Sequence, residues 1–334
     1  MKRRILLAGA LAMPVVARAA PIRRMRYASV GGATDAAVFL AMDDGIFGAH
    51  GIELDYQQLQ NAASLITATA TGQVDVAGIS LTPGLLASIG RGINIRVVGD
   101  KESIRAHFAA TQMVVRSSLA GGDMHEQLAR LRGRQIAISG RASASFVLLG
   151  LTAARHGISL DQFDIIELSY PNMIIAFANG AIDAAIMLEP YLSRLLLGKG
   201  FAAISDFTDV VPAHGGSIVP IVYSEALAAD QPAGQAFMLA YMTAVRRYND
   251  AITSGSGREH IFEIIARRTG MSIDVVRAST PSGYDPNQFV SPDFFKTVEQ
   301  FFLAQKLLRQ PVDINRLLDP SFADHAIAAL GRAT

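Results

Sequence analysis

The stretch SGRASAS, residues 139–145, combines residue types that can hold an anion. A strand is expected to end at Ser139 and a helix to begin near Ser143, so the first amides of that helix lack internal partners and point outward. Such amides and the helix dipole together form an anion site. Ser143 and Ser145 add hydroxyl donors, and Arg141 adds a guanidinium that can bind two oxygens at once. In the alternative interpretation, Ser143 only caps the helix and Arg141 lies in solvent.

Short polar turns also follow the other expected strands. Ligands of parallel α/β proteins bind outside the carboxyl ends of the strands, where small and hydroxylic side chains permit close approach and hydrogen bonding. The candidate ligand-binding residues are Thr34, Asp35, Asn61, Ser64, Ser80, Thr82, Arg141, Ser143, Ser145, Tyr170, Asn172 and Glu189. The first four could instead cap helices. Tyr170 could be half-buried packing, and Glu189, which precedes Pro190, could have a structural role.

The chain shows no recognisable arrangement of catalytic or metal-binding residues. It has no cysteine, which excludes thiolate metal sites, disulfides and cysteine nucleophiles. It also lacks a Walker loop, a complete dinucleotide fingerprint and a Gly-x-Ser-x-Gly elbow. The seven histidines are scattered, with no His-x-x-x-His pair. We therefore expect no cofactor, no bound metal and no enzymatic activity.

The first 19 residues have the pattern of a signal peptide. Lys2, Arg3 and Arg4 precede the 13-residue apolar stretch 5–17, which is too short to span a bilayer of roughly 30 Å. We expect cleavage after Ala19, by either the general secretory or the twin-arginine route. Removal of this segment takes four of the 30 basic residues and none of the 29 acidic ones, which changes the formal net charge from +1 to −3. Such a charge is not the footprint of a nucleic-acid-binding protein.

The elements that must position these residues alternate between strands and helices of about ten residues, which predicts parallel sheets built from βαβ units. One phrase occurs twice: TGQVDVAGISLTP at 71–83 resembles NGAIDAAIMLEP at 179–190, and HGI-x-LD precedes both. The repetition predicts two similar α/β lobes, which suits a length of 334 residues. A strand at 217–224 is expected to return the chain to the first lobe. The remainder is expected to be mostly helical, with an amphipathic helix through 233–252.

Four phrases in order resemble a known family: LAMDDGIFGAHGIELD, TGQVDVAGISLTPGLLASIGRGINIRVVGD, LRGRQIAISGRASASFVLLGLTAARHGI and FANGAIDAAIMLEPY. The chain is similar to periplasmic solute-binding proteins of ABC importers, in the group for nitrate, sulfonates, taurine and thiamine-pyrimidine precursors. The resemblance covers roughly residues 27–200. It implies an α/β type II periplasmic binding protein, with two doubly wound lobes joined by two crossing hinge strands and a helical C-terminus. Residues 24–111 plus 219–334 would form lobe 1, and residues 112–218 lobe 2.

The same resemblance implies a periplasmic protein that captures a small organic anion between its lobes. The anion would be a sulfonate, a taurine-like compound or an aromatic carboxylate. The expected partners are that ligand and an inner-membrane ABC permease with its ATPase, and the expected oligomeric state is a monomer. A pyrimidine or thiamine precursor, or nitrate, is the alternative ligand. An enzyme on the same fold, of the pyrimidine-synthase or menaquinone-pathway type, is the alternative class. An exported precursor without cysteine argues against both of these enzymes.

Overall fold

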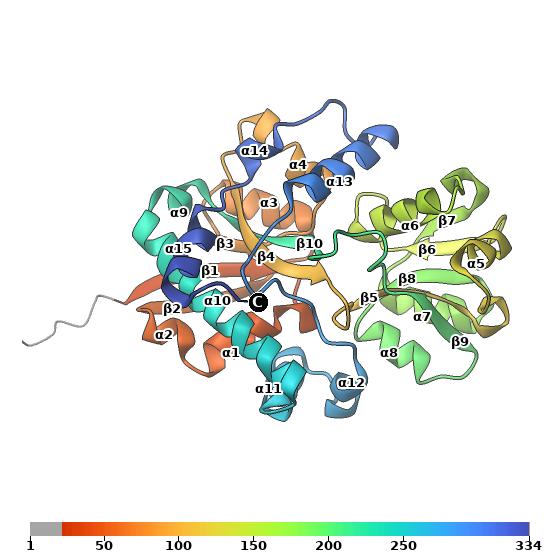
Figure 1. Cartoon of the computed structure of the whole chain (residues 1–334), viewed down its shortest axis with the longest axis horizontal. Helices are drawn as coiled ribbons and strands as arrows, with labels where there is room; N and C mark the ends of the chain where they lie inside the picture. The colour runs from red at the N-terminus through yellow and green to blue at the C-terminus, as the bar shows by residue number, and fades with distance from the viewer. Residues whose placement is uncertain (1–21, 334) are drawn as a thin grey trace, which may run out of the picture.

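The computed structural model describes residues 22–333, which form two α/β lobes side by side (Figure 1). The expected signal peptide and its cleavage site lie outside the described residues. The first sheet has the order β2-β1-β3-β10-β4, with β1 (Arg23–Ser29), β2 (Ile52–Gln58), β3 (Val76–Gly78), β4 (Arg96–Ile104) and β10 (Gly216–Tyr223). The second has the order β7-β6-β8-β5-β9, with β5 (Thr111–Arg116), β6 (Gln135–Ile138), β7 (Asp164–Glu167), β8 (Ala184–Leu188) and β9 (Phe201–Ser205).

Both sheets are mixed, which differs from the purely parallel sheets that the sequence predicts. In each sheet four strands run in the same direction, and the fifth, β10 or β5, runs antiparallel to its two neighbours. The reason is that β5 and β10 each enter from the other lobe, through the crossings 105–110 and 206–215. The two-lobed fold with two crossing segments is thereby confirmed, while β9 has no counterpart among the predicted strands. The strands place residue 111 in the second sheet and residues 216–218 in the first. The sequence-based bounds had put residue 111 in lobe 1 and residues 216–218 in lobe 2.

The helices cover the faces of both sheets (Figure 1). The first lobe has α1 (Ala36–Asp43), α2 (Ile46–Ala49), α3 (Ala62–Ala70) and α4 (Pro83–Leu86), and the second has α5 (Met124–Arg130), α6 (Ala144–Arg155), α7 (Tyr170–Ala178) and α8 (Tyr191–Leu196). The C-terminal part adds α9 (Glu225–Ala229), α10 (Gln231–Ser254), α11 (Arg258–Thr269), α12 (Ile273–Ala278), α13 (Pro292–Ala304), α14 (Ile314–Leu317) and α15 (Ser321–Leu330). None of the helices described between residues 22 and 333 has the length and apolar character that crossing a membrane requires.

The long helix α10 forms because its sequence suits both its ends and its buried face. The Asp230 carboxylate accepts a hydrogen bond from the amide of Ala233 at the start, and Gly255 adopts a left-handed conformation at the end. Every residue predicted for the apolar face is buried: Phe237, Ala240, Tyr241, Ala244, Val245, Tyr248 and Ile252. The helix packs with α1, α11 and α15 in the core of the first lobe.

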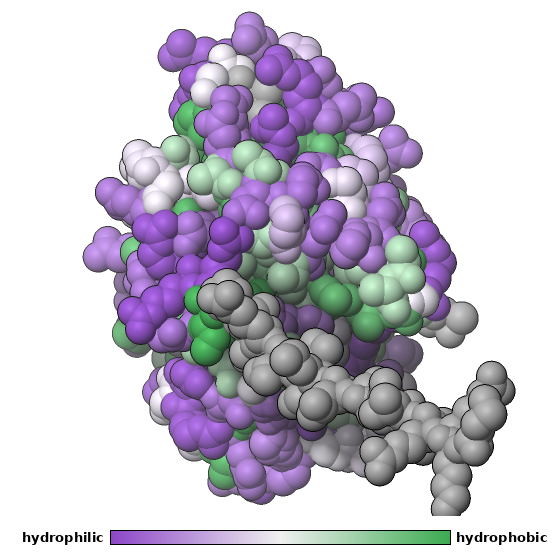
Figure 2. All heavy atoms as spheres, turned by 90° about the vertical axis from the view of Figure 1, so that its left-hand side faces the viewer, coloured by the Kyte–Doolittle hydropathy of each residue, from purple (hydrophilic) through white to green (hydrophobic). Residues whose placement is uncertain are grey.

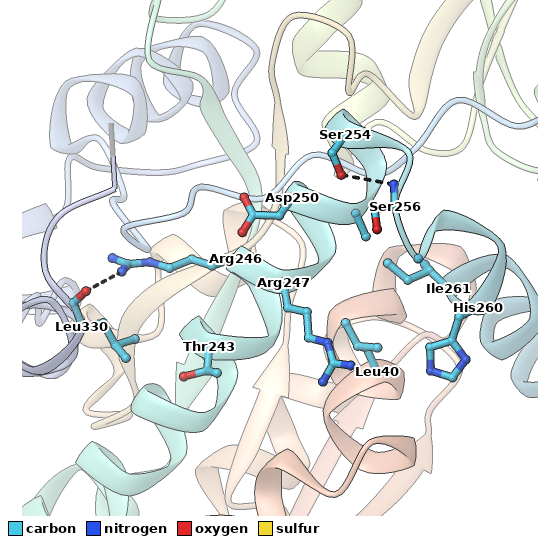
Figure 3. A pocket seen from close by; sticks show the side chains of 12 residues that line it. Leu40, Thr243, Arg246, Arg247, Asp250, Ser254, Ser256, His260, Ile261 and Leu330 are labelled. Atoms are coloured by element: carbon cyan, nitrogen blue, oxygen red, sulfur yellow. Dashed lines mark hydrogen bonds between the residues drawn. The ribbon is translucent and has the colours of Figure 1, made fainter.

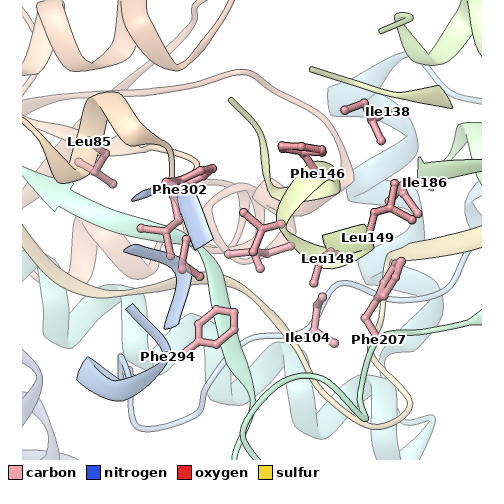
Figure 4. Packing of buried hydrophobic residues seen from close by; sticks show 14 of the residues in the cluster. Leu85, Ile104, Ile138, Phe146, Leu148, Leu149, Ile186, Phe207, Phe294 and Phe302 are labelled. Atoms are coloured by element: carbon pink, nitrogen blue, oxygen red, sulfur yellow. The ribbon is translucent and has the colours of Figure 1, made fainter. Parts of the chain in front are cut away.

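The other large core is continuous across both lobes. It runs from Leu85 in the first lobe through Phe294 and Phe302 of α13 to Phe146 and Leu149 of α6 in the second lobe (Figure 4). The helix α13 therefore belongs to the C-terminal part of the chain but packs against the second lobe. A contact of 5.2 Å between the ring centroids of Phe146 and Phe301 continues this apolar bridge. At Gly150 of α6, a Cβ atom would overlap the Phe301 ring, so the close approach requires glycine.

The face of the first lobe that points away from the second is mostly hydrophilic, with scattered apolar side chains between polar ones (Figure 2). Ion pairs such as Arg23–Asp230 at 2.6 Å and Arg24–Glu53 at 3.0 Å join elements of this lobe. Exposed pairs of this kind contribute little to stability. Single exposed apolar groups are ordinary on a protein surface.

Candidate functional site

A cavity of about 410 Å³ lies between the lobes, at the carboxyl ends of the parallel strands. The first lobe contributes the turn after β1, the end of β2 and the residues around the end of α11. The second contributes the start of α7 and the turn from β8 to α8. The lining residues are Val30, Gly31, Gly32, Ala33, Thr34, Phe39, Tyr56, Gln58, Tyr170, Leu188, Glu189, Pro190, Tyr191, Arg268, Thr269 and Met271.

The turn after β1 brings backbone amides to the cavity. Gly31 and Gly32 have positive φ angles of 82° and 107°, which residues with a side chain rarely adopt. The amide of Gly31 donates to Ser29 Oγ at 2.9 Å, which fixes the turn. Thr34 and Asp35 follow directly, so two of the candidate residues are held at the base of the cavity.

Asp35 is fully buried, and its carboxylate is already occupied by groups of the protein. It accepts hydrogen bonds from Tyr27 at 3.0 Å, Ser29 at 2.5 Å and Tyr56 at 3.0 Å. It also pairs with the ammonium group of Lys101 at 3.2 Å. A carboxylate with four such partners has little capacity left for a ligand. Asp35 therefore organises the floor of the cavity.

Lys101 was not among the residues expected from the sequence. Its side chain is 1% exposed, and its Nζ also donates to Thr34 Oγ1 at 2.9 Å. The register between β4 and β10 is irregular here, because Val219 pairs with Glu102 and Pro220 with Asp100, which leaves Lys101 unpaired. Such a bulge redirects side chains. The Lys101 stem passes so close to Gly78 that a Cβ atom there would overlap it.

Asp100 and Glu102 flank Lys101 on β4, and burial raises the pKa of each carboxyl to about 7. Asp100 accepts a hydrogen bond from the amide of Asp285 at 2.8 Å. Glu102 is 5% exposed and makes no hydrogen bond to any residue between 22 and 333. Burial raises the pKa of Tyr170 in the opposite lobe, and the charge of Glu102 raises it further.

The second-lobe wall of the cavity contains a pair of stacked aromatic rings. Tyr170 and Tyr191 lie with their centroids 5.7 Å apart and their planes at 20°. They begin α7 and α8, respectively, and both line the cavity. Aromatic rings at this position offer a flat apolar surface with polar hydroxyl groups at its edge.

The serine-rich turn before α6 is held by its own hydroxyl groups. Ser143 Oγ lies 2.7 Å from Ser145 Oγ and donates to the carbonyl of Gly140 at 2.5 Å, so it does not cap the helix amides. Arg141 points away from the cavity: its side chain is 48% exposed, lies 3.8 Å from Glu167 and donates to the carbonyl of Ile165 at 3.4 Å. These three candidates are not among the residues that line the cavity.

The remaining first-lobe candidates mostly serve as helix caps. Asn61 accepts from the amide of Ser64 at 2.9 Å, and Thr82 accepts from the amide of Leu85 at 3.2 Å. Ser80 and the exposed Asn172 are likewise outside the cavity lining. A ligand role for these residues stays a prediction.

Glu189 lines the cavity and also joins the two lobes. Its Oε1 accepts from the hydroxyl of Ser193 and from the amide of Thr280, both at 2.9 Å, and its Oε2 accepts from the amide of Ser193 at 3.0 Å. Ser193 Oγ donates in turn to the carbonyl of Ala278 at 3.0 Å. We call this group the Glu189 latch. Burial raises the pKa of the Glu189 carboxyl.

A larger hollow of about 620 Å³ lies on the first lobe, beside α1, α10 and α11 (Figure 3). Its basic side chains are bound to other groups of the first lobe. Arg246 donates to the carbonyls of Pro286 and Leu330, and Arg247 and His260 both contact Asp44, at 2.9 and 2.8 Å. The second lobe contributes no residue to this hollow. We therefore place the candidate site between the lobes.

The two mixed sheets and the cavity between them define a two-lobed α/β fold of the periplasmic binding protein type. A model of the NMT1/THI5-like family matches residues 34–247, which is more than half of the chain. The chain belongs to this family, and the resemblance noted from the sequence is confirmed. A Brucella abortus (strain 2308) protein named as a candidate binding protein is 26% identical over 202 residues. That match spans 58% of this chain and 58% of the relative.

Solved structures show the same fold. The aliphatic sulphonate-binding protein SsuA of Escherichia coli, described as periplasmic, gives a TM-score of 0.72 at 19% identity, over 89% of this chain and 92% of that one. The periplasmic nitrate-binding protein NrtA of Synechocystis PCC 6803 gives 0.71 at 13% identity, over 92% and 89%. The desulfurization enzyme DszB gives 0.63 at 18% identity, over 92% and 100%. The fold is that of ABC-import binding proteins, and it also hosts an enzyme.

Proposed function

We propose that this protein is the substrate-binding component of an ABC importer. In this proposal it is exported to the periplasm after cleavage behind Ala19 and acts as a monomer. It captures a small organic anion between its lobes and delivers it to an inner-membrane permease with an associated ATPase. Family membership and the shared fold of the sulfonate- and nitrate-binding proteins support the proposal.

The observation that carries the proposal is the cavity of about 410 Å³ with walls from both lobes. Its volume lies in the range of sites for small organic molecules. Because each lobe supplies part of the wall, a bound ligand makes more contacts when the lobes are close together than when they are apart. Ligand binding therefore shifts the population toward a closed state, which a permease can distinguish from the open one.

An anion suits the groups that face the cavity. The glycine turn before α1 lines the cavity, with the amide of Gly31 bound to Ser29, and α7 begins at the cavity wall with Tyr170. Helix N-termini and exposed amides favour negative charge. Arg268 adds a cationic side chain at the lining, although it also bonds to Asp43 at 3.0 Å. The volume favours an organic anion over a single nitrate ion.

Two alternatives can be separated from this proposal. A pyrimidine or thiamine precursor is favoured by the stacked rings of Tyr170 and Tyr191, on which a flat heterocycle can lie. An enzyme is the second alternative, because DszB has the same fold. This chain contains no cysteine, so an enzyme that works by nucleophilic catalysis here would need a nucleophile other than a thiolate.

A ligand screen on the mature protein tests the proposal. Sulfonates, carboxylates, nitrate and pyrimidines are added at a range of concentrations, and thermal unfolding is followed. A true ligand at a hundredfold excess over its Kd stabilises by about 2.7 kcal/mol. We expect organic anions to stabilise the protein and to be recovered unchanged after incubation. Stabilisation by pyrimidines alone would show that the ligand is a pyrimidine and not an organic anion. Product formation beyond one equivalent of the protein would show that the protein is an enzyme.

A further inference from the structure

Each of the two crossings between the lobes contains a residue other than glycine whose backbone is left-handed. His107 in the first crossing has a φ of 68°, and Phe207 in the second has a φ of 63°. In the described range 22–333, only Gln288 and Lys306 share this feature. The conformation is costly for a residue with a side chain, because its Cβ atom comes too close to the following carbonyl oxygen. Proteins keep such residues mainly at switch regions and functional sites.

His107 lies between two points at which the first crossing is attached to different lobes. Before it, Arg105 pairs with Asp285 of the first lobe at 2.8 Å. After it, the carbonyl of Ala110 accepts a hydrogen bond of 2.9 Å from the amide of Glu189 in the second lobe. A rotation of the backbone at His107 therefore changes the direction in which the chain leaves one lobe for the other.

The left-handed residue of the second crossing is held in place by packing. Phe207 is completely buried and belongs to the continuous core with Ile104 and Leu149 (Figure 4). Its amide donates to Ser205 Oγ at 3.0 Å, and its carbonyl accepts from the amide of Val210 at 3.2 Å. A change of the Phe207 backbone would break these contacts, so we expect the second crossing to keep its conformation when the lobes move.

The left-handed residue of the first crossing is held less firmly. The His107 side chain is exposed, and its turn is closed by one hydrogen bond of 3.0 Å, from the amide of Phe108 to the carbonyl of Arg105. His107 is the third residue of this turn, a position where a positive φ is normally supplied by glycine. Its backbone can therefore leave the left-handed region without the loss of a buried side-chain contact.

We propose that His107 is the pivot of the first crossing, and that its left-handed backbone acts as a spring that favours separation of the lobes. In this structure the lobes are together, joined by the Glu189 latch, and the cost at His107 is present in this arrangement. Rotation to a negative φ would release that cost and redirect the crossing, as hinge residues do. The inference goes beyond the proposed function, because it concerns the equilibrium of the lobes without a ligand.

The experiment measures the separation of the lobes directly. Because the chain has no cysteine, Arg194→Cys on α8 and Glu263→Cys on α11 introduce two unique sites for spin labels, both exposed and one in each lobe. Pulsed dipolar spectroscopy of the unliganded protein gives the distribution of distances between the labels. His107→Gly removes the cost of the left-handed backbone, and His107→Val raises it, since a β-branched residue tolerates a positive φ poorly.

We expect His107→Gly to raise the ratio of short to long distances about fivefold, the factor that corresponds to about 1 kcal/mol, and His107→Val to lower it at least as much. Lys306 provides the matched control, because it has a φ of 59°, is exposed and lies outside both crossings. Lys306→Gly and Lys306→Val should change the unfolding temperature in the same directions but leave the distances unchanged.

An unchanged distance distribution in both His107 variants would overturn the inference, and so would equal shifts in the Lys306 variants. Shifts in the opposite direction would show that the left-handed backbone favours the joined lobes, and they would also contradict it. If His107→Val does not fold, the comparison of His107→Gly with the wild type still decides. None of these outcomes depends on which ligand the protein binds, so the proposed function is tested separately.

Discussion

The two lobes have the same strand topology, but the groups at their strand ends are arranged differently. In the first lobe, Asp35 and Lys101 form a buried ion pair with Tyr27, Ser29 and Tyr56 around it. In the second, the corresponding edge carries serine hydroxyls, two stacked tyrosines and an exposed arginine. A repeated fold thus places a buried ion pair beneath one wall, and hydroxyl groups, stacked rings and the hydrogen-bonded carboxyl of Glu189 at the other. The comparison indicates that charges hold the strand ends of the first lobe in place, whereas hydrogen bonds between hydroxyl groups and ring stacking hold those of the second.

Among the variants that compare the two lobes, Lys101→Met should lower the free energy of unfolding the most. The variant leaves the Asp35 carboxylate buried without its cation, and breaking a buried pair from one side costs about 3–5 kcal/mol. Urea unfolding measures the loss. Arg141→Met is the second-lobe counterpart, whose exposed pair with Glu167 is worth less than about 1 kcal/mol. Equal losses in both variants would remove the proposed difference between the lobes.

The two titrating carboxyls of β4 should make stability depend on pH. Asp100 has a pKa of about 7 against an ordinary value of 3.8, so between these values the folded protein holds a proton that the unfolded chain releases. The free energy of unfolding should therefore fall as the pH rises from 4 to 7, by up to about 4 kcal/mol if the whole shift is realised. Denaturant titrations at several pH values measure the slope. The double variant Asp100→Asn/Glu102→Gln should flatten it, and an unchanged slope would place the titration elsewhere.

Gly78→Ala tests whether the Lys101 stem is confined. The added methyl group would overlap that stem, whose ammonium is held by Asp35 and Thr34, so we expect a loss of about 2 kcal/mol. Gly140→Ala in the second lobe is the matched control. There the nearest atom, Glu167 Oε2, lies 3.5 Å from the position that the added methyl group would take, an ordinary contact. Thermal unfolding of both variants gives the comparison, and a neutral Gly78→Ala would show that Lys101 can move aside.

Removal of the Glu189 latch should have a smaller effect on stability, about 1 kcal/mol, but a visible effect on shape. Glu189→Ala takes away the acceptor for the amide of Thr280, which joins the lobes. Small-angle scattering of the unliganded variant should give a larger radius of gyration than the wild type. Ser193→Ala keeps the bond to Thr280 and should change the radius less. Identical profiles for all three proteins would show that the latch does not hold the lobes together.

Local patterns predicted the elements well, because strand and helix periodicity are properties of neighbouring residues. The strand at 184–188 and the buried face of α10 follow directly from the sequence. The direction of β5 and β10 did not follow, because it depends on which lobe each strand comes from.

Only some of the candidate positions coincide with the residues that line the cavity. The turn at Thr34, the aromatic wall at Tyr170 and the cavity position of Glu189 were anticipated as candidate positions. Lys101 and Glu102 were not among the candidates because they lie within the strand β4 (Arg96–Ile104), and candidates were sought only in the turns that follow strands. Four consecutive polar residues inside an otherwise apolar strand, DKES at 100–103, were the signal that could have revealed them. The direction of Arg141 and the partner of Glu189 depend on distant segments, which local patterns do not report.

Because of the helix α13, the contacts between the lobes differ in kind on the two sides of the cleft. On its side the lobes meet through aromatic rings, and separating Phe146 from Phe301 would expose apolar area to water at roughly 25 cal/mol per Å². On the side of the Glu189 latch the lobes meet through polar groups. The hydrogen bonds between these groups can be replaced by hydrogen bonds to water at little net cost in free energy. The least costly separation of the lobes is therefore a rotation that keeps the aromatic side in contact and opens the side of the Glu189 latch. The cavity wall at Glu189 would then be the part that opens first.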